Sequence, residues 1–81
     1  MKLSVLLFAF AREAAGVESV ELEVPESATI SHARIALLRS VPKLAMRTGT
    51  LLWAVNNEFA ADDRVLYSTD VVACFPPVSG G

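Results

Sequence analysis

The segment from Pro76 to Gly81 is the part of this 81-residue sequence that is best suited to chemistry. It reads Pro76-Pro77-Val78-Ser79-Gly80-Gly81. The prolines favour an extended exit from the preceding strand, and the two glycines, which have no Cβ, can enter a narrow channel. A terminal carboxylate is ionised at neutral pH and is a poor electrophile. We therefore expect Gly81 to need activation, for example as an acyl-adenylate, inside the active site of another protein.

The remaining reactive side chains give no second site. Cys74 is the single cysteine, which excludes an internal disulfide and multi-cysteine metal sites. It lies in an apolar segment, where we expect a small buried thiol. His32 is the single histidine and should be a solvated residue of a helix. No phosphate-binding glycine loop, zinc-protease motif or nucleophile elbow is present in the sequence, so we expect neither a bound metal nor a bound cofactor.

The composition excludes several classes of protein. Hydrophobic residues make up 53% of the chain, which is incompatible with a disordered polar tail. Seven basic residues are scattered among nine acidic ones, for a net charge of −2, which argues against nucleic acid as a partner. No apolar run approaches the roughly 20 residues that cross a bilayer. We expect a soluble, reduced, cytoplasmic protein that does not enter membranes.

The apolar pattern predicts an α+β domain. Strands are expected over residues 2–9, 17–24, 51–55 and 71–75, with a hairpin through Asn56-Asn57 towards Phe59. A helix with Thr29 as its N-cap should end near Val41, because Pro42 follows. A mixed sheet of about five strands with one main helix on one face is the β-grasp, or ubiquitin-like, arrangement. Residues 1–75 would form this domain, and residues 76–81 its extended, flexible tail.

Two of the expected strands are apolar on both faces. A single helix covers one face of a sheet, and the other face of such a sheet should be polar. Residues 2–9 and 71–75 do not follow this rule, so we expect a partner protein to cover the second face. Phe8, Phe59 and Phe75 are the candidates for the contact patch. The alternative is that these rings fill the core beneath the helix.

Taken together, these segments resemble the molybdopterin synthase small-subunit family of ubiquitin-like sulfur carriers. The resemblance spans nearly the whole chain. Its motifs are the opening run from Val5 to Glu13 with Gly16, the hairpin Ala54-Val55-Asn56-Asn57, and the ending Phe75-Pro76-Pro77-Val78-Ser79-Gly80-Gly81. Carriers of the thiamine pathway share the fold and the final Gly-Gly, but typically lack the Phe-Pro-Pro-Val lead-in.

The resemblance implies a mechanism. An E1-like adenylating enzyme would consume ATP to adenylate Gly81, and a sulfur donor protein would convert the end to a thiocarboxylate. The tail would then enter the molybdopterin synthase large subunit, within a heterotetramer, and pass sulfur to cyclic pyranopterin monophosphate. By the same resemblance, Phe8, Arg12, Phe59 and Phe75 would contact this subunit. Pro76, Pro77, Val78, Ser79 and Gly80 would thread its active site.

One segment departs from the family pattern and leaves alternatives open. Where the family usually reads Asp-Gly-Asp-Glu, this chain has Ser68-Thr69-Asp70-Val71, so the turn loses its glycine and an acidic position becomes apolar. Cys74 also replaces a usual bulky residue. These changes raise the question of a different partner. The alternatives are a sulfur carrier of the thiamine or another pathway, a protein-conjugating ubiquitin-like modifier, and a non-catalytic interaction module.

Overall fold

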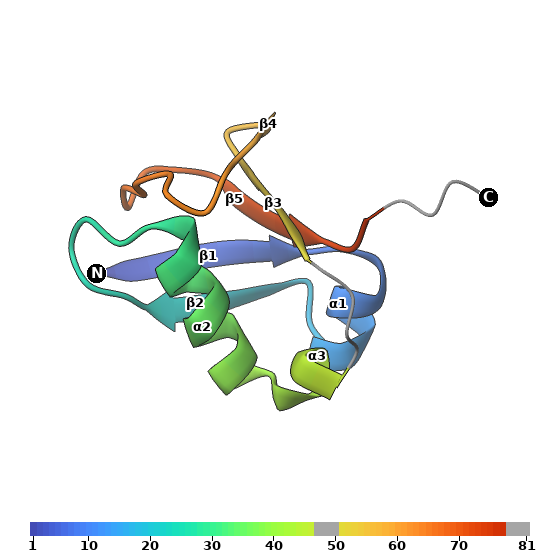
Figure 1. The fold of residues 1–81 in the computed structure, drawn as a ribbon. Helices are drawn as coiled ribbons and strands as arrows, with labels where there is room; N and C mark the ends of the chain where they lie inside the picture. The colour runs from blue at the N-terminus through green and yellow to red at the C-terminus, as the bar shows by residue number, and fades with distance from the viewer. Residues whose placement is uncertain (47–50, 78–81) are drawn as a thin grey trace.

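The computed structural model describes residues 1–46 and 51–77 (Figure 1). The helices and strands of this part of the chain are β1 (Lys2–Leu7), α1 (Ala9–Ala15), β2 (Ser19–Glu23), α2 (Ile30–Ser40), α3 (Pro42–Met46), β3 (Leu52–Val55), β4 (Glu58–Phe59) and β5 (Val72–Phe75). The strands form one sheet in the spatial order β2-β1-β5-β3-β4. β1 and β5 run parallel and the other neighbours are antiparallel, so the predicted mixed sheet is confirmed.

The two central strands follow from their alternating apolar residues. In β1, Leu3, Val5 and Leu7 are buried, whereas every second residue is exposed. In β5, Val72 and Cys74 are buried and the neighbouring side chains lie on the opposite face. Hydrophobic residues therefore occupy both faces of these strands, as the sequence predicts. β2, with its alternating glutamates, lies at the edge of the sheet, where a half-solvated strand is expected.

Helix α2 covers one face of the sheet (Figure 1). It buries Ile30, Ala33 and Leu37 in the core. Thr29 is its N-cap, as predicted, and the Thr29 N–H donates to His32 Nδ1 at 3.0 Å. The exposed His32 therefore helps to satisfy the open N–H groups at the start of the helix.

Chain reversals occur where the sequence offers residues that tolerate them. Gly16 ends α1 with φ of 76°, the left-handed conformation that a glycine adopts without a Cβ clash. α2 ends at Ser40, and Pro42 begins α3. Asn56 and Asn57 have φ of 53° and 68° and form the predicted hairpin between β3 and β4.

The turn that precedes β5 closes without the glycine of the family pattern. Among the described residues other than glycine, positive φ occurs at Ala9, Ser27, Asn56 and Asn57, so the turn from Tyr67 to Asp70 needs no left-handed residue. The Asp70 N–H donates to the Tyr67 carbonyl at 3.0 Å and closes the turn. Ser68 and Thr69 are therefore compatible with a regular turn at this place.

The core lies between the sheet and the helices. Trp53, Leu66 and Leu44 join the buried residues of β1, β5 and α2 in one hydrophobic cluster. In the part of the chain that the structure describes, no helix has the length and apolar character needed to cross a membrane. The predicted boundary between a domain over 1–75 and a tail over 76–81 stays a prediction, since residues 78–81 lie outside the described part.

Candidate functional site

An apolar groove lies on the sheet face opposite α2. Its floor is formed by Ala54 of β3 and Ala73 of β5, which are neighbours in the β3–β5 pairing. Bulkier side chains surround this floor and enclose a hollow of about 310 Å³. The lining residues are Leu6, Phe8, Ala54, Asn57, Phe59, Val71, Ala73 and Phe75. The hollow exists because two small residues meet at the centre of the face while larger ones flank them.

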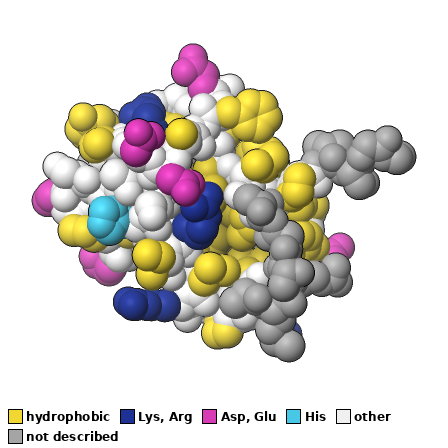
Figure 2. Space-filling view, viewed as in Figure 1, with side chains coloured by type: hydrophobic (Ala, Val, Ile, Leu, Met, Phe, Trp, Pro, Cys, Tyr) yellow, Lys and Arg dark blue, Asp and Glu magenta, His cyan; other side chains and the backbone are white. Residues whose placement is uncertain are grey.

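The three predicted phenylalanines meet around this groove. Phe8 is 48% exposed and Phe59 is 80% exposed, so neither fills the core beneath the helix. The rings of Phe59 and Phe75 lie 5.8 Å apart between centroids, with an angle of 55° between their planes. Figure 2 shows hydrophobic side chains gathered between the β4 tip and the end of β5. The predicted exposed apolar patch is confirmed, and the alternative of a core position is wrong for Phe8 and Phe59.

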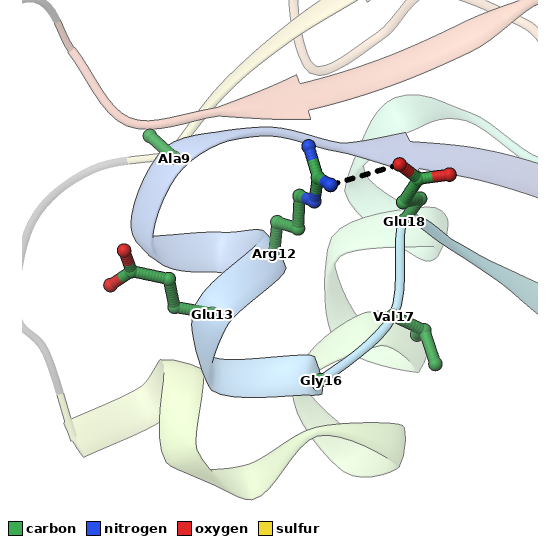
Figure 3. A pocket seen from close by; sticks show the side chains of 6 residues that line it. All are labelled: Ala9, Arg12, Glu13, Gly16, Val17 and Glu18. Atoms are coloured by element: carbon green, nitrogen blue, oxygen red, sulfur yellow. Dashed lines mark ion pairs between the residues drawn. The ribbon is translucent and has the colours of Figure 1, made fainter.

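Arg12 lies outside the groove, on α1. Its guanidinium pairs with the Glu18 carboxylate at 2.9 Å, beside a hollow at the end of this helix (Figure 3). The side chains of Arg12 and Glu18 are 55% and 76% exposed, so water screens the pair and it stabilises the fold little. The guanidinium therefore stays accessible to another carboxylate. Its predicted contact with a partner stays a prediction.

The single cysteine is shielded by the core. Cys74 has no exposed surface, and burial raises the pKa of its thiol to about 12. The thiolate, which is the nucleophilic form, is therefore scarce at neutral pH. Within residues 1–46 and 51–77, no group of three or more His, Cys, Asp or Glu side chains could hold a metal ion.

The start of the tail adjoins the groove. Phe75 ends β5 and also lines the groove. Pro76 is half-buried and Pro77 is exposed, so the chain leaves the sheet towards solvent. The predicted functional residues Val78, Ser79, Gly80 and Gly81 lie outside the described residues, and their roles stay predictions.

The sequence did not point to every residue of the groove. Leu6 alternates with Phe8, and Val71 and Ala73 alternate with Phe75, so each shares a strand face with a phenylalanine that the sequence did single out. The role of Ala54 and the position of Asn57 depend on how β3 pairs with β5 and turns into β4. The sequence does contain a sign of the groove floor, because Ala54 and Ala73 are small residues within apolar strands. Only the β3–β5 register shows that these two alanines are neighbours.

A model of the ThiS family matches residues 5–81 of this chain. The chain belongs to the ThiS family. Members described as molybdopterin synthase sulfur carrier subunits include one from Haemophilus influenzae, 38% identical, covering 98% of this chain and 99% of its own length. The corresponding protein of Arabidopsis thaliana is 33% identical, with coverages of 100% and 84%.

Solved structures of similar proteins share the fold of this ThiS-family chain. The crystal structure of SAMP1 from Haloferax volcanii has a TM-score of 0.87 at 32% identity, and the match covers 100% of both chains. A putative molybdopterin converting factor subunit 1 from Pyrococcus furiosus has a TM-score of 0.84 at 30% identity, with coverages of 96% and 99%. The predicted β-grasp fold is confirmed.

Proposed function

We propose that this ThiS-family chain is the sulfur carrier subunit of molybdopterin synthase. The single observation that carries the proposal is the family match over residues 5–81, which includes the Gly-Gly ending. Relatives that are 32% to 38% identical over nearly all of this chain are described as such carriers. In this role Gly81 bears the sulfur as a thiocarboxylate and donates it to cyclic pyranopterin monophosphate.

Activation of Gly81 takes place on other proteins. An E1-like adenylating enzyme uses ATP to make the acyl-adenylate, with release of pyrophosphate, and a sulfur donor protein displaces AMP. The carrier itself binds no cofactor in these steps. This division of labour agrees with the buried thiol of Cys74, which is too protonated to act as a nucleophile.

Recognition by the large subunit is assigned to the apolar groove. A partner that covers Phe8, Phe59 and Phe75 removes apolar surface from water, the main favourable term in association. Phe75 belongs both to the groove and to the strand from which the tail leaves. A large subunit seated there therefore receives the tail next to its contact surface, and the resulting complex is the proposed heterotetramer.

Intact-mass spectrometry tests the carrier chemistry. The full chain is incubated with the adenylating enzyme, ATP and a sulfur donor, and we expect a mass change equal to exchange of one oxygen for sulfur. A chain lacking Gly81 should keep its far-UV circular dichroism and its affinity for the large subunit, yet transfer no sulfur. Unchanged transfer without Gly81 would contradict the proposal and favour an interaction module.

A protein-conjugating modifier is the second candidate, because the similar SAMP1 is described as a small archaeal modifier protein. In that case the activated Gly81 forms an amide with lysine side chains rather than a thiocarboxylate. Denaturing electrophoresis of a tagged chain after activation separates the two outcomes. Higher-mass bands that resist thiols and require Gly81 would support conjugation.

A carrier for thiamine instead would release its sulfur only to the enzymes of that pathway.

A further inference from the structure

One end of the apolar groove is fixed by hydrogen bonds between two turns. The Asn56 N–H donates to the Val71 carbonyl at 2.8 Å, and the Val71 N–H donates to Asn56 Oδ1 at 2.9 Å. Asn56 Nδ2 donates to Asp70 Oδ1 at 3.0 Å. Asp70 Oδ2 accepts the N–H of Tyr67 at 2.8 Å. We call this chain of bonds through Asn56 and Asp70 the clasp.

The clasp replaces a bond that regular strand pairing would provide. Val55 faces Val72 in the β3–β5 register, which places residue 56 opposite residue 71. Opposite residues of an antiparallel ladder can exchange both N–H···O bonds through their backbones. At Asn56, φ of 53° takes the chain into the hairpin, and the side-chain oxygen accepts the Val71 N–H in place of a backbone carbonyl.

Each donor of the clasp meets one acceptor. The Val71 N–H meets an oxygen at residue 56, the amide of residue 56 meets an oxygen at residue 70, and the second oxygen there meets the Tyr67 N–H. A carboxylate only accepts, whereas a carboxamide both donates and accepts. The clasp therefore needs one carboxamide and one carboxylate at positions 56 and 70.

The groove depends on this arrangement although neither clasp side chain lines it. Val71 follows Asp70, Asn57 follows Asn56, and both neighbours line the groove. Phe59, which pairs with Ala54, stands on the short strand that the same hairpin begins. A change in the angle between the two turns would shift these side chains relative to Phe75.

We propose that Asn56 and Asp70 are positioning residues that hold the groove in the shape that binds the large subunit. The inference rests on the proposed function for the identity of the partner. Binding surfaces that are already ordered lose less conformational entropy on association. The affinity of the large subunit for the apolar groove thus depends on two polar residues, Asn56 and Asp70, that the large subunit need not touch.

A charge-neutral exchange of the two side chains tests the proposal. Asn56→Asp places two carboxylates against each other, and Asp70→Asn leaves one N–H directed at another. Each single variant should bind the purified large subunit about tenfold more weakly, a coupling of ordinary size for contacting residues. The double variant Asn56→Asp/Asp70→Asn restores every donor–acceptor match and should recover most of the affinity.

Asp62→Asn serves as the matched control. Like Asp70→Asn, this substitution removes an exposed aspartate whose side chain is bonded, here to Arg34 at 2.7 Å. Asp62 does not line the groove. Its affinity for the large subunit should equal that of the original chain. Binding is measured by calorimetry at a temperature where circular dichroism shows that every variant is folded. Under this condition a variant that is only less stable keeps the affinity of the original chain.

Nuclear magnetic resonance provides a readout without the partner. Nuclear Overhauser effects between the rings of Phe59 and Phe75 should weaken in both single variants and return in the double variant. If the original chain binds no large subunit, the proposed function fails, and the ring contacts still report on the clasp. Full affinity and unchanged ring contacts in both single variants would overturn the clasp inference itself.

Discussion

At the scale of single residues, size and burial separate the binding surface from the core. Ala54 and Ala73 leave room on the outer face, whereas Cys74, which lies next to Ala73 in the chain, points into the opposite layer. Successive side chains of a strand alternate between faces. The same short strand therefore supplies an accessible groove and an inaccessible thiol.

The thiol of Cys74 should resist alkylation in the native protein. Burial raises its pKa to about 12, and the group has no exposed surface. We expect iodoacetamide at about pH 8 to leave the folded chain unmodified over hours and to react fully in guanidinium chloride. Mass spectrometry of both samples checks this. Rapid modification without denaturant would contradict the burial of this residue.

At the scale of elements, turns and caps determine how the strands meet. The left-handed Gly16 ends α1, and two left-handed asparagines begin β4. The turn before β5 instead depends on Asp70, which bonds the N–H of Tyr67 and the amide of Asn56. This carboxylate takes part in both local geometry and the link to the neighbouring hairpin.

Acid should weaken the fold through Asp70. The bond from the Tyr67 N–H, aided by the Asn56 amide and the charge of Arg64, holds the pKa of Asp70 below its ordinary value of 3.8, against a smaller opposing effect of desolvation. The unfolded chain therefore binds the proton first as pH falls. The stabilisation is present above the unfolded pKa and is lost as pH falls through the folded pKa.

Urea unfolding between about pH 6 and about pH 3 measures this effect. The difference in unfolding free energy between the original chain and Asp70→Asn should shrink as pH falls through this range. Asp62→Asn, studied in parallel, reports how much another exposed aspartate, the partner of Arg34, contributes to the pH dependence. A constant difference at every pH would show that Asp70 does not titrate differently in the folded and unfolded states.

At the scale of the whole molecule, the core covers one face of the sheet and the other face carries the apolar groove. α2 and the core cover the first, and Phe8, Phe59 and Phe75 surround the groove on the second. In Figure 2, charged side chains of both signs lie over the α2 side of the molecule. The groove therefore lies on the face that the core leaves uncovered.

Phe59→Ser should separate binding from stability. Phe59 is 80% exposed, so its loss removes little beyond the ring contact with Phe75, and we expect a stability change of about 1 kcal/mol. Affinity for the large subunit should fall by tenfold or more, because aromatic anchors dominate interfaces. Calorimetry and thermal unfolding measure the two quantities.

Ile35→Ser is the matched control for this experiment. Ile35 is another exposed apolar residue, at 51%, but it belongs to α2 and does not line the groove. Its removal should leave the affinity unchanged. Equal losses of affinity in the two variants would mean that the partner does not select the groove.

Much of this architecture was predictable, for reasons that vary among the segments. The alternation in residues 2–9 and 71–75 predicts both strands and the uncovered face, and Asn56-Asn57 predicts a hairpin. The clasp was not predictable, because it joins residues 56 and 70, which become neighbours only through the β3–β5 pairing. His32 likewise looked like a plain surface residue, and only the helix geometry shows its bond to Thr29.

The parallel pairing of β1 with β5 has a consequence for biosynthesis. β1 is synthesised before β5 and can pair with this central neighbour only after β5 has been made. Such long-range pairing incurs the full loop-closure entropy of the intervening chain and gives slow, late folding. A nascent chain that still holds β5 in the exit tunnel cannot complete the sheet or shape the groove. A product truncated before β5 therefore cannot form the groove, because this strand supplies part of its floor.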